Sequence, residues 1–408
     1  MGALTAPPAR AARPGERVVL VERPGLRFAR AAFDVWRAGR TLVPLDPALP
    51  PARLEALAAR ARARPDDGAG SEAPAAVIFT SGTAGEPKGV VLTRASLDAS
   101  AAASAARLGT GPSDTWLCCL PLHHVAGISM LWRAVHDRSG LVIHDGFQPG
   151  RVASALASGR ATCVSLVART LERTLDAASA AGRRFSPRLR AVLVGGGPTP
   201  EALLARARAA GLPVCRTYGL TEASSQVATQ RPGEADETCG EPLPGVLVRI
   251  DAPDAGGAGE VLVRGPTVMR GYDGEPPLAP GEWLRTGDIG RLDAAGRLSI
   301  LDRRTDLIVT GGENVSPARV EAALEAHPAV AEACVVGRPD PSWGQRVVAV
   351  VRLRDGASLS DADLEAHCRD RLARYEVPHE IVRVAAPLPR TGKGIPRRAE
   401  VRRSASPG

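Results

Sequence analysis

The chain has 408 residues, of which 44% are hydrophobic, 24% charged and 3% aromatic, and its formal net charge is +8. This length and composition are those of a globular protein of two or more domains, and no segment approaches the roughly 18 apolar residues that a membrane helix needs. Because the arginines are scattered and aromatic residues are scarce, the charge favours a site for small polyanions over a nucleic-acid surface.

The cysteines and the N-terminus indicate the compartment. Seven cysteines without a C-x-x-C pair argue against a disulfide framework or a zinc site and favour a reducing cytoplasm. The start of the chain is rich in Arg and Ala, as in a transit peptide, but a strand at ERVVLV follows closely and no apolar leader with a cleavage site is present. We interpret residue 1 as the start of the mature protein.

Short apolar strands alternate with helical segments through most of the chain. RVVLVE precedes RFARAAFDVWRAG, AAVIFT precedes a glycine-rich loop and SLDASAAASAARLG, TWLCCL precedes GISMLWRAV, and RAVLVG precedes PEALLARARAAG. The last helix has Pro200 in its first turn and Gly211 at its end, which are preferred positions for these residues. The alternation predicts an α/β fold with parallel, doubly wound sheets.

The pattern changes towards the C-terminus. Short strands separated by turns over residues 245–301 predict a small β-subdomain, and the helices and strands that follow predict a compact α+β unit. We therefore expect an N-terminal domain over residues 1–302 and a C-terminal domain over residues 303–408.

The glycine-rich loop FTSGTAGEPKGVV has the composition of a phosphate-binding loop. Its glycines let backbone N–H groups surround an oxyanion, its hydroxyls add donors, and one lysine supplies charge. Measured from Gly82, the spacing differs from a Walker loop, because Pro87 stands where the second glycine would be. A plain surface turn is the alternative. The candidate phosphate-binding residues are Thr80, Ser81, Gly82, Thr83, Gly85 and Lys88.

Lysine is rare in this chain. Of the 52 basic residues only Lys88 and Lys393 are lysines. Arginine replaces lysine where the two are interchangeable, but a compact ammonium that contacts a phosphate or carboxylate as a point charge is not interchangeable with a planar guanidinium. The two positions therefore indicate a role that arginine cannot fill.

Seven blocks, in order, resemble those of the adenylate-forming enzymes, which include acyl-CoA synthetases, luciferases and adenylation domains. The blocks are TSGTAGEPKG, LPLHHVAG (120–127), VLVGGGPTP (192–200), YGLTEAS (218–224), WLRTGDIG (283–290), DRRTDLIVTGGENVSP (302–317) and PRTGKGIPRR (389–398). The resemblance runs from about residue 17 to the end. It implies a mobile C-terminal domain, ATP and Mg²⁺ as ligands, and CoA as co-substrate.

The resemblance also implies roles for residues of the nucleotide site. Loop 80–89 would hold the β- and γ-phosphates, Thr221 would donate to the α-phosphate, and Glu222 would bind Mg²⁺, which prefers few carboxylates plus phosphate oxygens. Asp288 would accept both ribose hydroxyls, since a carboxylate is acceptor-only. The remaining nucleotide candidates are Arg303 at the ribose, Gly195, Gly196 and Gly197 at the adenine, and Tyr218 and Gly219.

Lys393 would bridge the carboxylate and the α-phosphate during adenylation. Its block departs from the family's, since Thr391 is followed at once by Gly392 and Lys393 where two residues usually intervene. After adenylation the C-terminal domain would turn about Thr305 and Asp306. Gly311 and Gly312 would then leave room for the pantetheine arm of CoA.

Three local features, GGGPTP, SQVAT and HHVAGISMLWR, resemble the o-succinylbenzoate–CoA ligases of menaquinone biosynthesis. That acid has a second carboxylate that needs a cationic or donor-rich partner. The substrate candidates are His124, Arg133, Ser225 and Gln226, and for Arg133 the alternative is a charge on a helix surface. With Thr221, Glu222 and Lys393, His124 is also a catalytic candidate.

We therefore expect an AMP-forming acid–CoA ligase that converts o-succinylbenzoate, ATP and CoA to o-succinylbenzoyl-CoA, AMP and diphosphate. Other aryl or acyl acid–CoA ligases, an adenylation enzyme that loads a carrier protein, and a non-catalytic adenylate-binding relative remain as alternatives. The chain starts later than is usual for the family. The expected partners are the acid, ATP and CoA, without nucleic acid or membrane insertion, and the sequence leaves a homo-oligomer open.

Overall fold

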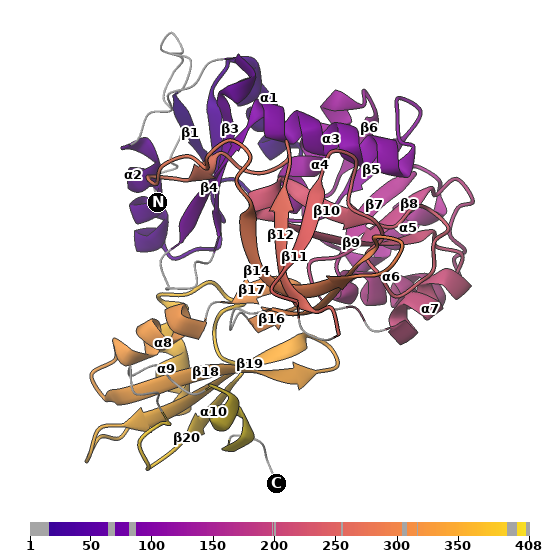
Figure 1. Cartoon of the computed structure of the whole chain (residues 1–408). Coiled ribbons are helices and arrows are strands. Elements are labelled where there is room, and N and C mark those ends of the chain that lie inside the picture. Colours follow the sequence, from indigo (N-terminus) through magenta and orange to yellow (C-terminus); the bar gives the residue numbers. More distant parts are fainter. Residues whose placement is uncertain are drawn as a thin grey trace.

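The computed structural model describes residues 16–63, 70–80, 87–197, 199, 201–253, 256–303, 308–315, 317–389 and 398–404. These residues form a large lobe with three sheets and a small lobe with a fourth sheet, which lies below the large lobe in Figure 1. The large lobe's third sheet ends at Arg303, and the small lobe's sheet begins at Ile308.

The first sheet has the strand order β1-β2-β3-β4-β13. Its strands β1, β2 and β3 are parallel, whereas β4 is antiparallel to both β3 and β13. Helices α1 and α2 and the short helix η1 accompany it. The bounds are β1 Arg17–Leu20, α1 Leu26–Arg37, β2 Thr41–Pro44, α2 Pro51–Arg62, η1 Gly70–Glu72, β3 Pro74–Thr80, β4 Lys88–Thr93 and β13 Gly271–Tyr272.

Strand β4 was not expected from the sequence. We expected the glycine-rich loop to lead directly to a helix, but the apolar run GVVLT first pairs antiparallel with β3. Thr93 then ends the strand and caps the helix α3 (Arg94–Leu108), since its hydroxyl accepts a hydrogen bond from Ser96 N. Lys88 is therefore the first residue of a strand of the sheet.

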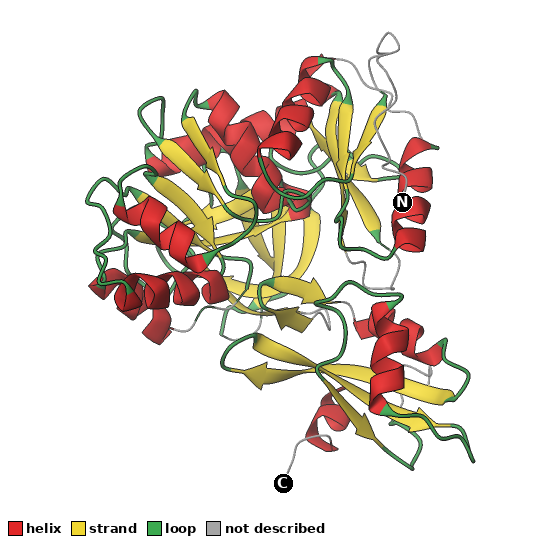
Figure 2. Ribbon diagram, turned by 180° about the vertical axis from the view of Figure 1, so that it is seen from behind, coloured by secondary structure: helices red, strands yellow, loops and turns green. Residues whose placement is uncertain are grey.

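The second sheet has the order β10-β9-β8-β7-β5-β6, and only β10 is antiparallel to its neighbour. Helices flank both of its faces, as Figure 2 shows from behind. The bounds are β5 Thr115–Cys118, α4 Val125–His136, β6 Gly140–Ile143, α5 Pro149–Ala157, β7 Cys163–Leu166, α6 Ala168–Ala180, β8 Ala191–Val194, α7 Glu201–Ala209, β9 Val214–Leu220, η2 Thr221–Ala223 and β10 Ser225–Thr229.

Side chains alternate between two hydrophobic cores across this sheet. Trp116 and Cys118 of β5 pack in the core that α1, α3 and α4 share, whereas Leu117 packs in the core under α5, α6 and α7. Successive strand residues point to opposite faces, so a strand buried on both faces is apolar throughout. This confirms the predicted α/β class with doubly wound sheets.

The third sheet is the predicted small β-subdomain. Its four strands are antiparallel in the order β11-β12-β14-β15. They span β11 Leu247–Asp251, β12 Gly259–Arg264, β14 Leu284–Leu292 and β15 Leu298–Arg303.

The small lobe has its own hydrophobic core, which includes Val335, Val347 and Leu364. Strands β17, β16, β19 and β18 follow one another in its sheet, and β20 pairs with β19. The bounds are β16 Ile308–Thr310, β17 Glu313–Val315, α8 Pro317–Glu325, β18 Val330–Asp340, β19 Gly344–Leu353, α9 Asp361–Arg369, β20 Glu380–Arg383 and α10 Arg398–Ser404. Among the described residues, no helix has the length and hydropathy to span a membrane.

Candidate functional site

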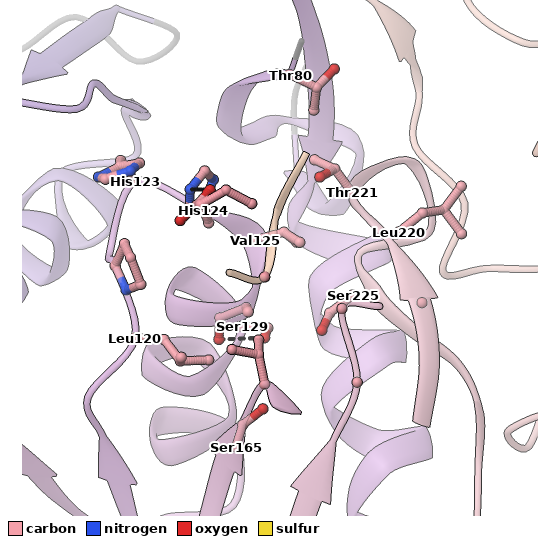
Figure 3. Close-up of a pocket in the computed structure, with 18 of the residues that line it drawn as sticks. Thr80, Leu120, His123, His124, Val125, Ser129, Ser165, Leu220, Thr221 and Ser225 are labelled. Atoms are coloured by element: carbon pink, nitrogen blue, oxygen red, sulfur yellow. Dashed lines mark hydrogen bonds and ion pairs between the residues drawn. The ribbon is translucent and has the colours of Figure 1, made fainter. Parts of the chain in front are cut away.

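A cavity of about 690 Å³ lies where the three sheets of the large lobe and the small lobe meet. Figure 3 shows Thr80 and Thr221 near one end of it and Ser165 near the other. The predicted site residues that line the cavity are Thr80, Lys88, His124, Arg133, Gly195, Gly196, Gly219, Thr221, Glu222, Ser225, Gln226, Asp288, Gly311 and Gly312.

The other predicted residues do not line the cavity or cannot be placed. Tyr218 and Gly197 lie outside the cavity wall, and the backbone of Arg303 pairs with that of Asp288 across β14 and β15. Ser81, Gly82, Thr83, Gly85, Lys393 and the hinge candidates Thr305 and Asp306 lie outside the described residues.

Lys88, Tyr272 and Glu222 are adjacent at one end of the cavity. The Lys88 Nζ atom lies 4.4 Å from the centre of the Tyr272 ring and 4.0 Å from Glu275 Oε1. The Tyr272 hydroxyl donates a hydrogen bond of 3.1 Å to Glu222 Oε1. Burial and the nearby Glu222 carboxylate raise the pKa of Tyr272, so its hydroxyl remains a donor near neutral pH.

The donor set around Glu222 suits Mg²⁺ bound together with phosphates. No group of three or more His, Cys, Asp and Glu side chains that could hold a metal occurs in the described part of the chain. Mg²⁺ is usually held by one or two carboxylates plus substrate phosphates rather than by an all-protein cage. A single cavity carboxylate next to a candidate phosphate-binding lysine fits this pattern.

Asp288 is buried in the cavity wall and is held in place by its neighbours. Its Oδ2 atom accepts a 2.6 Å hydrogen bond from the Tyr218 hydroxyl, and its backbone N–H donates to Thr286 Oγ1. The sequence predicts that Tyr218 contacts the nucleotide, but the structure places Tyr218 behind Asp288. Tyr218 therefore orients the predicted ribose acceptor.

Two glycines of the predicted site are required by close backbone packing. A Cβ atom on Gly219 would lie 1.6 Å from the Ser225 carbonyl oxygen of the adjacent strand β10. A Cβ atom on Gly195 would lie 2.6 Å from the Thr217 carbonyl oxygen. Real side chains do not approach backbone atoms so closely, so these positions admit only glycine without movement of the strands.

Arg133 lies in the cavity wall, and the alternative of a helix-surface charge is wrong. Its exposed fraction is 2%, and its Nη2 atom lies 3.4 Å from Ser225 Oγ. Burial lowers its pKa to about 10, despite the opposing effect of Asp137. Within the described residues, Arg133 forms no ion pair with a carboxylate and its Nε atom has no hydrogen-bond partner.

Gln226 and Ser225 extend this polar wall. Gln226 Nε2 donates to Thr229 Oγ1 at 2.7 Å, whereas its Oε1 atom has no hydrogen-bond partner among the described residues. Ser224 and Ser225 have positive φ values of 54° and 107°. Such conformations are costly for residues other than glycine and often occur at functional sites.

His124 joins the two lobes at the middle of the cavity. Its Nε2 atom lies 2.9 Å from Glu313 Oε2 of the small lobe, and its ring lies 4.3 Å from that of His123. Burial alone would lower the pKa of His124, but the Glu313 and Asp46 carboxylates together outweigh burial and raise it. Burial and His124 lower the pKa of His123 to about 4.

The hairpin β16–β17 and its neighbours dock the small lobe against the cavity. Gly311 and Gly312 have φ values of 59° and 89°, and their missing Cβ atoms would lie within 3 Å of Trp343 and Val167. The Arg169 guanidinium stacks 3.6 Å above the Trp343 ring and donates to the Ser342 carbonyl at 2.7 Å.

Among the cavity residues that were missed from the sequence are Glu313, Tyr272 and Tyr375. Glu313 lies within the block DRRTDLIVTGGENVSP (302–317), but the block predicts no role for it. The tyrosines have a signal in their rarity, since the chain has only three. Tyr272 and Tyr375 line the cavity, and Tyr218 supports its wall through Asp288. The rarity of tyrosine could therefore have identified these residues, just as the rarity of lysine identified Lys88.

The chain has two family matches. Residues 58–273 match the AMP-binding enzymes, and residues 319–394 match the AMP-binding enzyme C-terminal domain. The chain belongs to the AMP-binding enzyme family. This confirms the resemblance to adenylate-forming enzymes that the sequence blocks indicate.

Curated relatives of this family member include the 2-succinylbenzoate–CoA ligase of Geobacillus kaustophilus. It is 42% identical over 345 residues, which cover 81% of this chain and 69% of that protein. The chain spans about two thirds of the length of the curated relatives that it matches, from 64% to 69%.

Two solved structures of one Bacillus subtilis protein differ in their similarity to this family member. A double mutant of o-succinylbenzoate CoA synthetase bound to a product analogue has a TM-score of 0.86 at 31% identity, covering 96% of this chain and 88% of that one. The same enzyme with its acyl-adenylate intermediate has a TM-score of 0.66 at 31% identity, covering 95% and 88%. The lobes of this chain are therefore arranged more like those of the product-analogue complex.

Proposed function

We propose that this chain is an ATP-dependent o-succinylbenzoate–CoA ligase of menaquinone biosynthesis that acts through an acyl-adenylate. The observation that carries the proposal is Arg133, a buried cation that forms no ion pair among the described residues, in the wall of a cavity that Lys88, Glu222 and Asp288 also line. A fatty acid would gain nothing from a buried guanidinium, whereas the ring carboxylate of o-succinylbenzoate would pair with it. The names of the curated relatives support the same acid.

The reaction needs activation because a carboxylate oxygen is a poor leaving group. In the first step the succinyl carboxylate attacks the α-phosphorus of ATP, the bond to the bridging oxygen breaks, and diphosphate leaves. In the second step the CoA thiolate attacks the acyl carbon and AMP leaves. Such steps depend on positioning and on donors aimed at the developing charge.

The residues of the cavity supply these donors. Lys88 would contact the β- and γ-phosphates, Thr221 would donate to the α-phosphate, and Asp288 would bind the ribose. Glu222 would hold Mg²⁺, which when bound neutralises part of the phosphate charge. Arg133 with Ser225 and Gln226 would hold the ring carboxylate.

The small lobe would serve the second step in the observed arrangement. Gly311 and Gly312 lie at the cavity wall, where the absence of side chains lets Trp343 and Val167 pack against them. The pantetheine arm of CoA would pass along this part of the wall. We infer that residues 1–302 and 303–408 act as two domains, with the hinge near Thr305 and Asp306, and that Lys393 enters the cavity for adenylation. The roles of Ser81, Gly82, Thr83, Gly85 and Arg303 stay predictions of the same kind.

Two further expectations concern the protein as a whole. All seven cysteines are free thiols, which suits a reducing cytoplasm. A homo-oligomer stays a prediction, and the oligomeric state would be measured by light scattering.

Mass spectrometry of the products from ATP, Mg²⁺, CoA and a panel of acids tests the function. We expect o-succinylbenzoyl-CoA and AMP, with no other acid converted comparably. If another acid were preferred, the ligase reaction would stand and the substrate would be wrong. If no acid gave an adenylate or a thioester, the ligase reaction itself would be wrong.

A further inference from the structure

Tyr272 lies between two oppositely charged residues, Lys88 and Glu222, at the end of the cavity that would bind ATP. Its ring faces the Lys88 ammonium at 4.4 Å, and its hydroxyl donates to Glu222 Oε1 at 3.1 Å. Neither the sequence blocks nor the proposed reaction assigns it a role. It is therefore a cavity residue that touches both of the charged groups expected to bind MgATP.

The backbone next to Tyr272 supports both neighbours. Met269 N–H donates to the Glu222 carbonyl at 2.7 Å, and Asp273 N–H donates to the Gly89 carbonyl at 2.7 Å. Tyr272 itself pairs with Val90 of β4. The segment 269–273 thus fixes the position of β4, which carries Lys88, relative to η2, which carries Glu222.

The arrangement addresses an electrostatic conflict. A lysine and a glutamate that line one cavity attract each other, and a direct ion pair would have to break before either could bind MgATP. Tyrosine offers each a weaker partner, since a ring face attracts a cation by about 0.5–1 kcal/mol and a neutral hydroxyl gives the carboxylate one hydrogen bond. The Lys88–Glu275 contact is also weak, because it is long at 4.0 Å and half exposed.

We propose that Tyr272 is a positioning residue for MgATP, which keeps Lys88 and Glu222 apart and orients the Glu222 carboxylate towards the metal. The inference rests on the proposed function, because it assumes that these two residues bind MgATP. It concerns the binding of nucleotide and metal and the adenylation step, and it assigns Tyr272 no part in thioester formation.

Calorimetric titration with ATP at a series of Mg²⁺ concentrations tests this inference without turnover. We expect Tyr272→Phe to raise the Mg²⁺ concentration needed for half-maximal ATP affinity about 5- to 20-fold, because a hydrogen bond to a charged group is lost. Tyr272→Leu also removes the ring, so ATP affinity should fall further as Lys88 and Glu222 pair. Tyr375→Phe, which removes a hydroxyl from the small-lobe wall of the same cavity, is the matched control and should leave the Mg²⁺ dependence unchanged.

A double-mutant cycle separates positioning from packing. In a Glu222→Gln background, Tyr272→Phe should have little further effect on Mg²⁺ dependence, because both changes act on one interaction. Equal Mg²⁺ dependence of Tyr272→Phe and the wild type, with unchanged melting temperatures, would overturn the inference, and so would full additivity with Glu222→Gln. If the wild type bound no ATP at any Mg²⁺ concentration, the proposed function would fail first and the inference with it.

Discussion

His124 of the large lobe and Glu313 of the small lobe form an ion pair across the cavity, with Nε2 and Oε2 2.9 Å apart. His124 immediately precedes α4, and Glu313 begins β17, so the pair exists only while the lobes are docked as observed. The pKa of His124 is raised and the pKa of Glu313 is lowered, each against the effect of burial. Docking therefore favours the charged form of both residues.

The pair predicts a pH-dependent docking of the lobes. Because its pKa is raised, His124 stabilises the docked lobes fully below its ordinary pKa of 6.5, and this stabilisation is lost as pH rises through the raised pKa. Because its pKa is lowered, Glu313 stabilises the docked lobes fully above its ordinary pKa of 4.5, and this stabilisation is lost as pH falls through the lowered pKa. Docking should be strongest between these ordinary values and weaken at alkaline pH. In single-turnover acyl transfer from supplied acyl-adenylate to CoA, Glu313→Gln should be about fivefold slower than the wild type at acidic pH, the equivalent of about 1 kcal/mol.

The ratio of the two rates isolates this effect, because the ionisation of the CoA thiol affects both enzymes alike. The ratio should approach one as pH rises above the His124 pKa. A ratio that stays constant across the whole pH range would show that the ion pair does not control docking.

Arg133→Ala should weaken binding of the acid more than it weakens binding of ATP. We expect the KM for o-succinylbenzoate to rise about 10- to 100-fold, because a charged hydrogen-bonded pair is lost. Steady-state kinetics with o-succinylbenzoate and with the analogue that lacks the ring carboxylate would measure it. If the KM values of both acids rose by the same factor, Arg133 would be structural and would not recognise the carboxylate.

Lys393→Ala should slow adenylation about 10²- to 10³-fold, by analogy with the loss of one transition-state donor. Thioester formation from supplied acyl-adenylate should keep its rate, since Lys393 is expected to leave the cavity before that step. Lys393→Arg should be slow as well, because a planar fork does not replace a compact ammonium. Rapid-quench measurement of both half-reactions distinguishes the outcomes, and an unaffected adenylation rate would remove Lys393 from the mechanism.

Gly219→Ala should destabilise the protein by at least about 3 kcal/mol, because its Cβ would overlap the Ser225 carbonyl at 1.6 Å. Gly150 is the matched control, since it lies in α5 with open space around its Cβ position. Gly150→Ala should be neutral or stabilise by up to about 0.5 kcal/mol. Urea denaturation of both variants checks the difference, and equal stabilities would contradict the packing of β9 on β10.

The fold was predictable where local patterns reflect local structure. Apolar strands alternating with helices indicated the second sheet, because crossover helices must join its parallel strands. The antiparallel strand β4 was missed, since its apolar run lies between a loop and a helix, and its first residues were read as the end of the loop. Pairing of β4 with β13 joins Val90 to Tyr272, and contacts so distant in the chain leave no local pattern.

The site likewise contains residues that the local sequence predicts and a residue that it does not. Lys88, Thr221, Glu222 and Asp288 belong to short blocks whose chemistry can be read locally, and all four line one cavity. Glu313 gains its importance only through His124 in the other lobe. Local patterns in a single sequence do not show how two lobes dock, so this contact was found only in the structure.

The stacking of Arg169 on Trp343 has a practical consequence for following the enzyme. Trp343 is the one tryptophan among the chain's five that belongs to the small lobe, and it lies against a cation of the large lobe. Movement of the lobes would remove the guanidinium from the indole ring and expose the ring to water. The intrinsic fluorescence of Trp343, with the other four tryptophans replaced by phenylalanine, would therefore report lobe movement in real time during a single turnover, without an attached dye.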